Sequence, residues 1–301
     1  MGEAMATEPA TVAVIGLGNM GLPMAGHLLA AGHRVQGCDL RPGPAAALAA
    51  LGGVVAPDPA AAARGAGLVI TSLPTAAALA EVVGGDRGLA TAVADGVIVI
   101  ETSTLPVPAK EQAARLLGRA GAVLLDCPVS GSASQLRSRD VVVYASGEPA
   151  AIGRCRSVLA TFSRAQHLVG AFGNGMRMKL IANHLVAVHH TAAAEALLLA
   201  GRAGLDPALA LRALADGAGN SRMLEIRGPM MLSGDFSDAN IALAVFCKDI
   251  DLISELARDT CCPLPLFTAA AQLHLAALGQ GRAAEDPACV HAVLAEMSQP
   301  R

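Results

Sequence analysis

Aromatic residues are scarce in this chain, whose 301 residues include five phenylalanines, one tyrosine and no tryptophan. Hydrophobic residues still make up 53% of the sequence, so a core must be built from Ala, Leu, Val, Ile and Met. No run approaches the roughly 20 apolar residues that a membrane-spanning helix needs, so we expect no membrane partner. The length is sufficient for two domains.

Positive charge is not in surplus either. With 22 Lys and Arg against 25 Asp and Glu, the net charge is −3, so we expect no nucleic-acid partner. The seven cysteines form no C-x-x-C pair, which favours reduced thiols in the cytoplasm over a disulfide framework. The histidines lack the H-E-x-x-H spacing, and we expect no metal site. Residues 1–10 hold two glutamates and no basic residue, which indicates a short disordered leader rather than a signal peptide.

An apolar run that leads into three glycines is the most informative feature of the sequence. Residues 11–21 read TVAVIGLGNMG, a short β-branched strand followed by a helix expected to begin near Asn19. In a G-x-G-x-x-G turn the first glycine permits the tight turn, the second lets the backbone approach a pyrophosphate, and the third lets the helix pack on the strand. The residues predicted to bind a dinucleotide here are Gly16, Leu17, Gly18, Asn19, Met20 and Gly21.

A carboxylate at the end of the second strand supports this prediction. Asp39 lies 18 residues beyond Gly21, where an acidic residue binds the adenosine ribose hydroxyls. Such a carboxylate repels a 2′-phosphate and favours NAD. Arg41 can accept that phosphate, so NADP stays possible.

Strand and helix signals alternate up to about residue 170. Apolar strands are expected at 33–40, 67–73, 96–100, 122–126, 141–145 and 167–169, the last two completing one mainly parallel sheet. After Gly173 the pattern is helical, with helices expected at 179–202, 207–217, 221–227, 239–259, 266–279 and 285–297. The fold class is therefore α/β: a Rossmann domain over residues 11–172 and an all-helical domain over residues 173–301.

Two polar residues near the start of the long helix are candidates for catalysis. Lys179 and Asn183 are four residues apart and share one helix face. A lysine beside a nicotinamide ring can exchange a proton with a carbonyl or alkoxide, and an asparagine can orient a substrate with a donor and an acceptor. Two glycines precede this pair, at the domain junction.

Several separated motifs together resemble the β-hydroxyacid dehydrogenase family, which includes 3-hydroxyisobutyrate, tartronate semialdehyde and L-threonate dehydrogenases. The resemblance covers about residues 11 to 298. It rests on the glycine turn with its trailing Pro-Met-Ala, the Asp-Cys-Pro-Val-Ser-Gly segment at 126–131, the segment 173–183, and the pair Lys248-Asp249. It implies a Rossmann domain, a helical domain that builds a homodimer or homotetramer, and NAD(P)-dependent interconversion of a small β-hydroxy acid with its semialdehyde or keto acid.

The resemblance also implies residue roles. Lys179 would be the general acid/base and Asn183 would bind the substrate beside it. Leu73, Pro74 and Thr104 would line the nicotinamide side of the cofactor cleft. The substrate-binding residues would be Ser130, Gly131, Ser132 and Lys248, the last of which would also reach the cofactor.

Departures from the family pattern leave the substrate open. Ser132 stands where a second glycine is usual, Ala182 stands where Asn is frequent, and Arg139 replaces a usual Gly. Residues 217–222 resemble the L-threonate-like branch, and Ser132, Ser134 and Arg222 could select a polyhydroxylated acid. Arg222 fits a surface position equally well, and His184 fits a packed position on the helix better than a substrate contact.

Two other functions remain open. An imine reductase or another carbonyl reductase could use the same scaffold, although imine reductases commonly replace the lysine. A non-catalytic dinucleotide-binding scaffold protein is the other alternative, and such relatives lose the lysine too.

Overall fold

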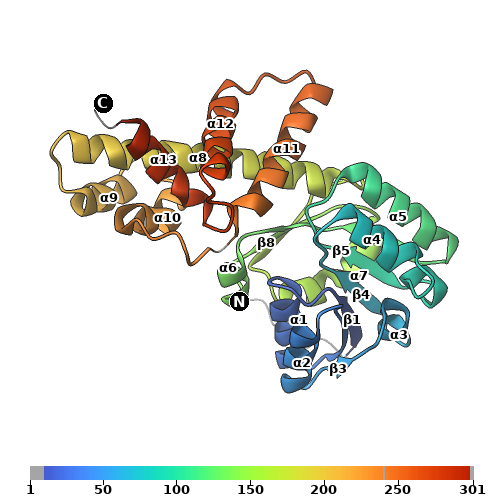
Figure 1. The fold of residues 1–301 in the computed structure, drawn as a ribbon. Coiled ribbons are helices and arrows are strands. Elements are labelled where there is room, and N and C mark those ends of the chain that lie inside the picture. The colour runs from blue at the N-terminus through green and yellow to red at the C-terminus, as the bar shows by residue number, and fades with distance from the viewer. Residues whose placement is uncertain (1–9, 240, 299–301) are drawn as a thin grey trace, which may run out of the picture. The chain divides into compact units, whose positions relative to one another are not determined.

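The structure is a computed structural model that describes residues 10–239 and 241–298 (Figure 1). The chain divides into an N-terminal unit, residues 1–179, and a C-terminal unit, residues 180–301, and helix α8 (Asn174–Arg202) contains the point of division. The boundary expected between residues 172 and 173 stays a prediction. The expected leader lies, apart from Ala10, outside the described residues.

Six parallel strands form the main sheet of the N-terminal unit. Their spatial order is β3-β2-β1-β4-β5-β6, the strand order of a Rossmann fold, which confirms the predicted fold class. The strand order reverses between β1 and β4, and ligands of such sheets bind outside the carboxyl ends of the strands at that point. The strands are β1 (Thr11–Ile15), β2 (Arg34–Cys38), β3 (Val54–Val55), β4 (Leu68–Thr71), β5 (Ile98–Glu101) and β6 (Val123–Asp126).

The strands are in register at the edge where they end. Cys38 of β2 is opposite Ile15 of β1, Ile15 is opposite Thr71 of β4, Thr71 is opposite Glu101 of β5, and Glu101 is opposite Asp126 of β6. The residues that follow these five therefore leave the sheet along one line.

Two expectations about the strands were wrong. The segments near 141–145 and 167–169 do not complete the main sheet. They form β8 (Val142–Ala145) and β9 (Ala165–Leu168), which join β7 (Val129–Ser130) in a second sheet of order β7-β8-β9. An apolar run identifies a strand but not its partner, and the exposed two-residue strand β3 gave no such signal.

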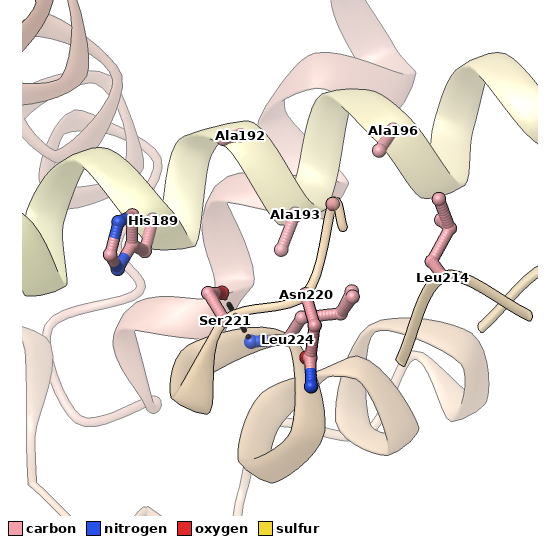
Figure 2. A pocket seen from close by; sticks show the side chains of 9 residues that line it. His189, Ala192, Ala193, Ala196, Leu214, Asn220, Ser221 and Leu224 are labelled. Carbon is pink, nitrogen blue, oxygen red and sulfur yellow. Dashed lines mark hydrogen bonds between the residues drawn. The ribbon is translucent and has the colours of Figure 1, made fainter. Parts of the chain in front are cut away.

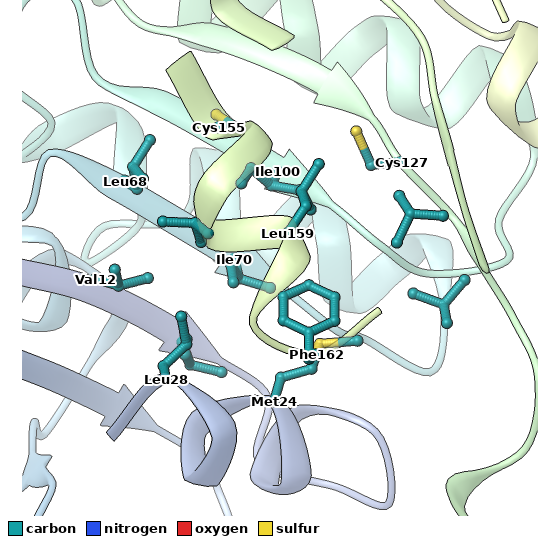
Figure 3. Packing of buried hydrophobic residues seen from close by; sticks show 14 of the residues in the cluster. Val12, Met24, Leu28, Leu68, Ile70, Ile100, Cys127, Cys155, Leu159 and Phe162 are labelled. Atoms are coloured by element: carbon teal, nitrogen blue, oxygen red, sulfur yellow. The ribbon is translucent and has the colours of Figure 1, made fainter. Parts of the chain in front are cut away.

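Alternate strand residues supply two separate cores, one on each face of the main sheet. Val12 and Val14 face a cluster with α1 and α7, in which Met24, Leu28 and Phe162 are buried (Figure 3). The intervening residues face a second cluster with α3, α4 and α5. The helices of this unit are α1 (Gly21–Ala30), α2 (Pro42–Ala50), α3 (Pro59–Ala63), α4 (Ala76–Gly84), α5 (Val107–Arg119), α6 (Ala133–Arg137) and α7 (Pro149–Ala160), with a 3₁₀ turn η1 (Leu89–Thr91).

Helix α1 begins two residues later than the sequence suggested. Met20 is its N-cap and Gly21 its first residue, because residues 18–20 form the turn that follows β1. Helix α8 instead begins earlier than expected, at Asn174.

The described part of the C-terminal unit is helical. Besides α8 it contains α9 (Pro207–Asp216), α10 (Arg222–Ser233), α11 (Leu243–Asp259), α12 (Pro265–Gly279), the 3₁₀ turn η2 (Pro287–Cys289) and α13 (Val290–Met297). Helix α10 continues past the expected end at residue 227, although Gly228 and Pro229 usually interrupt a helix. A Cβ atom on Gly228 would lie 2.5 Å from the end of the Leu211 side chain of α9, so glycine lets α10 pack closely there. None of the described helices is long and apolar enough to span a membrane.

Candidate active site

The three glycines of the turn after β1 have different structural roles. Gly16 has φ +87°, and a Cβ atom there would collide with the backbone oxygen of Ser72 after β4. A Cβ atom on Gly21 would collide with the carbonyl oxygen of Gly16, so only glycine lets α1 start so close to the turn. A Cβ atom on Gly18 would meet only Arg41 Nη2, at 3.4 Å. The side of Gly18 is therefore open, and the N–H groups of the first turn of α1 make this cradle suitable for a pyrophosphate.

Asp39, just beyond β2, is held by four hydrogen bonds. Its Oδ2 accepts from the Leu17 N–H at 2.8 Å and from Arg41 Nη2 at 3.2 Å, and its Oδ1 accepts from the Arg41 N–H at 2.9 Å and from Nε at 3.1 Å. Burial would raise the pKa of Asp39, but the hydrogen bonds from Arg41 and Leu17 outweigh burial and lower it. Asp39 is therefore an ionised, largely buried carboxylate, whereas the side chain of Arg41 is 64% exposed.

The loops after β4 and β5 are tied together. The Leu73 N–H donates to Ser103 Oγ at 2.8 Å. Leu73 and Thr104 are half-buried and Pro74 is exposed. The loops that contain these three residues thus follow neighbouring strands at the carboxyl edge of the sheet. That the three residues contact the cofactor stays a prediction.

The predicted substrate loop has a fixed backbone. Ser130 ends β7 and is paired with Val142 of β8, and Gly131 has φ +139°, where a Cβ atom would lie 2.7 Å from Val141. Ser132 is the N-cap of α6: its hydroxyl accepts from the Gln135 N–H, and Gln135 Oε1 accepts from the Ser132 N–H. The structure therefore gives Ser132 a capping role, which the Ser-x-x-Gln spacing could have revealed.

Arg139, Ser134 and Arg222 each have a local structural contact. Arg139 has φ +60°, the left-handed region that favours glycine, and its guanidinium donates to the Ala160 carbonyl at 3.0 Å. The hydroxyl of Ser134 lies 2.8 Å from that of Ser132, within the same helix cap. Arg222 lies 4.0 Å from Glu225 one turn later on the exposed side of α10.

Both predicted catalytic residues are buried on α8, Lys179 with 8% and Asn183 with 5% of its surface exposed. Asn183 Nδ2 donates to Asp249 Oδ2 at 2.8 Å, and Lys248 Nζ lies 3.7 Å from Asp249 Oδ1. Asp249 was absent from the predicted site although it adjoins Lys248, and the structure makes it the partner that orients the Asn183 amide. His184, one residue along α8, packs on Phe267 with ring centroids 5.5 Å apart, in agreement with the packed position favoured above.

A fully buried charge cluster that the sequence did not predict lies at the carboxyl edge of the main sheet. Lys110 of α5 lies 2.6 Å from Glu101 Oε2 and 2.7 Å from Asp126 Oδ1, and all three side chains are inaccessible to solvent. Burial would lower the pKa of Lys110, but the two carboxylates outweigh it and raise the pKa. One signal was present: Lys110 shares the buried face of α5 with Ala113 and Leu117, where a lysine is out of place.

A cavity of about 180 Å³ lies in the C-terminal unit, between the alanine-rich part of α8 and the segment before α10 (Figure 2). Ser221 caps α10 there by accepting from the Leu224 N–H at 3.1 Å, and Asn220 Nδ2 donates to Glu225 at 2.7 Å. Its lining includes none of the catalytic, substrate or cofactor residues predicted above. The described residues contain no cluster of three or more His, Cys, Asp or Glu that could hold a metal ion.

Comparison with known proteins agrees with this architecture. The NAD-binding domain model of 6-phosphogluconate dehydrogenase matches residues 11–173, and the NAD-binding model of NADP-dependent 3-hydroxyisobutyrate dehydrogenase matches residues 173–294. An L-threonate dehydrogenase of Cupriavidus necator is 36% identical over 93% of this chain and 94% of its own. The chain belongs to the β-hydroxyacid dehydrogenase family.

Other relatives in this family have the same reaction class. A 3-hydroxyisobutyrate dehydrogenase of Pseudomonas aeruginosa is 34% identical over 72% of this chain and 73% of its own. The crystal structure of a 3-hydroxyisobutyrate dehydrogenase from Salmonella typhimurium matches with a TM-score of 0.85 and 31% identity, covering 94% of this chain and 99% of that one. The protein is thus an NAD(P)-dependent oxidoreductase that acts on a CH–OH group.

Proposed function

We propose that this β-hydroxyacid dehydrogenase oxidises L-threonate, or a closely related four-carbon polyhydroxy acid, with Lys179 as general acid/base. The similarity to the Cupriavidus necator L-threonate dehydrogenase over nearly the whole of both chains carries this proposal. The preference that the sequence suggested for Ser132, Ser134 and Arg222 stays a prediction, and each of these side chains also has a local structural contact. Ser132 and Ser134 belong to the cap of α6, and Arg222 faces Glu225 on an exposed helix surface.

Lys179 supplies the proton transfer. Bound NAD(P)⁺ supplies the hydride acceptor for the carbon that bears the reacting hydroxyl. As that carbon loses hydride, neutral Lys179 Nζ takes the hydroxyl proton and becomes an ammonium; in the reverse direction the ammonium returns the proton to the carbonyl oxygen. Asn183, one turn further along α8, orients the substrate while Asp249 holds its amide.

Ser130 and Gly131 are proposed to bind the substrate carboxylate. The hydroxyl of Ser130 and the N–H of Gly131 are donors suited to a carboxylate, and the pairing of β7 with β8 fixes Ser130, the residue before Gly131. Lys248 stays a proposed contact for substrate and cofactor.

NAD is the proposed preferred cofactor. A carboxylate offers about four lone-pair sites, and four donors already occupy Asp39. The ribose hydroxyls must therefore compete with the Arg41 side chain for Asp39. Once displaced, the exposed guanidinium of Arg41 is available to a 2′-phosphate, so NADP is accepted less well but not excluded.

Turnover of a substrate panel tests the proposal. We would follow NAD and NADP reduction with threonate, glycerate, 3-hydroxyisobutyrate and 3-hydroxypropionate. We expect threonate to give the highest kcat/KM and NAD to exceed NADP. A higher kcat/KM for 3-hydroxyisobutyrate would contradict the substrate assignment. Silence across the panel, with NAD binding intact, would instead favour an imine or another carbonyl as the substrate.

We also propose a homodimer or homotetramer located in the cytoplasm. The α8 face with Ile181, Leu185 and Leu199 leaves large apolar side chains exposed, which supports association through the helical unit. Four of the seven cysteines are buried as free thiols, which fits a reducing compartment. Light scattering of the purified enzyme measures the assembly directly, and a monomer would refute it.

A further inference from the structure

The cost of the buried charge cluster indicates that it has a role beyond stability. Glu101, Lys110 and Asp126 are removed from water completely, and apolar side chains of similar volume usually stabilise a core at least as well. What such a cluster supplies is fixed geometry. The three donors of the Lys110 ammonium face three oxygens, those of the two carboxylates and the Ser103 carbonyl at 2.7 Å.

One side of the cluster fixes the loops after β4 and β5. Glu101 Oε1 accepts from the Ser103 N–H at 2.9 Å, and Lys110 donates to the Ser103 carbonyl. Ser103 Oγ in turn accepts the N–H of Leu73. The loop after β5 is thus bonded directly to the cluster through Ser103, and the loop after β4 is bonded to it through Leu73 and Ser103.

The other side of the cluster holds the start of α8. Asp126 Oδ2 accepts from the Met176 N–H at 2.8 Å and from the Ser146 hydroxyl at 3.1 Å. Ser146 Oγ accepts the N–H of Gly175 at 2.9 Å. A Cβ atom on Gly175 would lie 2.5 Å from the carbonyl oxygens of Asp126 and Tyr144, so the helix approaches as closely as glycine allows. A carboxylate at this end also complements the helix dipole.

Lys179 follows this anchor by three residues, less than one helical turn beyond Met176. We propose that the Glu101–Lys110–Asp126 cluster positions Lys179 for proton transfer, with Lys110 as the positioning residue. This inference rests on the proposed role of Lys179. Lys110 acts through Asp126: without the ammonium, two buried carboxylates share the site, one must take up a proton or move, and the acceptor for α8 is disturbed.

Lys110→Met is the test, because methionine keeps the length of the side chain and removes the charge. The matched control is Leu117→Val, which loosens the same buried face of α5 two turns away. Both full-length variants would be compared with the wild type in hydrogen exchange of the peptide covering residues 174–180, in kcat and in the Kd for NAD. We expect faster exchange in that peptide and a kcat at saturating NAD lower by up to about 10²-fold, as for a catalytic group displaced by about 1 Å. The Kd for NAD reports separately on the loops after β4 and β5, which Lys110 also holds through the Ser103 carbonyl.

Three results would overturn the proposal. The first is unchanged exchange at the start of α8 in Lys110→Met. The second is a loss of kcat in Leu117→Val equal to that in Lys110→Met, which would mean general destabilisation. The third is faster exchange with unchanged turnover. The Lys179→Ala variant decides separately whether the proposed acid/base is right.

Ser146→Ala keeps the test decisive if Lys110→Met does not fold. It removes only the hydroxyl between Asp126 and Gly175 and leaves all three charges in place. We expect the same pattern with a smaller loss of kcat. Unchanged exchange and turnover in this variant would refute anchoring through Asp126.

Discussion

Each unit of this enzyme buries an ion cluster, and the two clusters are bonded to different partners. In the N-terminal unit Lys110 and its carboxylates are bonded to backbone groups of strand-end loops and of the first turn of α8. In the C-terminal unit Arg227 Nε lies 2.6 Å from Asp286 Oδ1, and that oxygen also accepts the Ala288 N–H of η2. The first cluster holds segments predicted to contact cofactor and substrate. The second joins α10 to η2. Burial of a charge therefore does not identify a functional group; the backbone that the charge fixes is more informative.

Of the substitutions proposed for this enzyme, removal of the proposed acid/base in the N-terminal unit should lower kcat most. Lys179→Ala is expected to lower kcat by about 10² to 10⁴-fold, because a positioned proton-transfer group is lost, and to leave the Kd for NAD unchanged. Arg177→Ala is the control, since Arg177 is an exposed cation on the same helix. Loss of NAD binding in Lys179→Ala would indicate a structural lysine instead.

Breaking the C-terminal ion pair should affect stability rather than chemistry. Arg227→Met leaves Asp286 buried without its cation, which should cost about 3 to 5 kcal/mol in the free energy of unfolding. Arg222→Met on the same helix removes an exposed pair with Glu225 and should cost about 0 to 1 kcal/mol. Denaturant unfolding measures both. A large fall in kcat of the folded Arg227→Met enzyme would contradict the view that the C-terminal ion pair contributes to stability and not to catalysis.

Asp39 is another largely buried charge that is bonded to a backbone group, the Leu17 N–H, and its loss should change cofactor choice. Asp39→Ala removes the ribose acceptor and releases Arg41, so the Kd for NAD should rise about tenfold or more while that for NADP falls. Titration of both cofactors gives the ratio. An unchanged ratio would show that Asp39 does not contact the ribose.

Two buried histidines of the C-terminal unit should also make its stability depend on pH. Burial, with the charge of Arg227 as a further cause, lowers the pKa of His190 well below its ordinary value, and burial lowers that of His274 despite a hydrogen bond to the Ala270 carbonyl. Below about pH 6.5 the unfolded chain binds protons that the folded chain does not, so stability is complete above that pH and falls as the pH decreases. Tm measured between pH 7.5 and 5.5 should fall less in His190→Phe than in the wild type. Equal slopes would refute the assignment.

The smallest expected effect is that of replacing Ser132 in the N-terminal unit. This substitution distinguishes a structural role of the side chain from a role in substrate binding. Ser132→Ala removes the N-cap of α6, which should cost about 1 kcal/mol and lower Tm by a few degrees, with KM for threonate unchanged. A KM raised tenfold without loss of Tm would instead support the substrate-binding role that the sequence predicts for Ser132.

Local pattern made much of this protein predictable. The glycine turn, five of the six strands of the main sheet and the helical second half follow from spacings within a few residues. The same holds for the expected ribose acceptor, Asp39, whose distance from the turn is set by one helix and one strand. The predicted roles of Lys179, Asn183 and Ser130 also came from short motifs, and they await the experiments above.

Tertiary structure alone decided which distant segments meet. The sequence marks 141–145 as a strand, but its partners in β7 and β9 follow from the path of the chain after Asp126. It marks Lys110 as an odd member of an apolar face, but not that carboxylates 9 and 16 residues away neutralise it there. Nor does it show that Asp249 takes the amide of Asn183, 66 residues earlier. Short-range periodicity is encoded by neighbours along the chain, whereas the pairing of buried charges depends on the register of strands and the packing of helices, which the whole fold sets together.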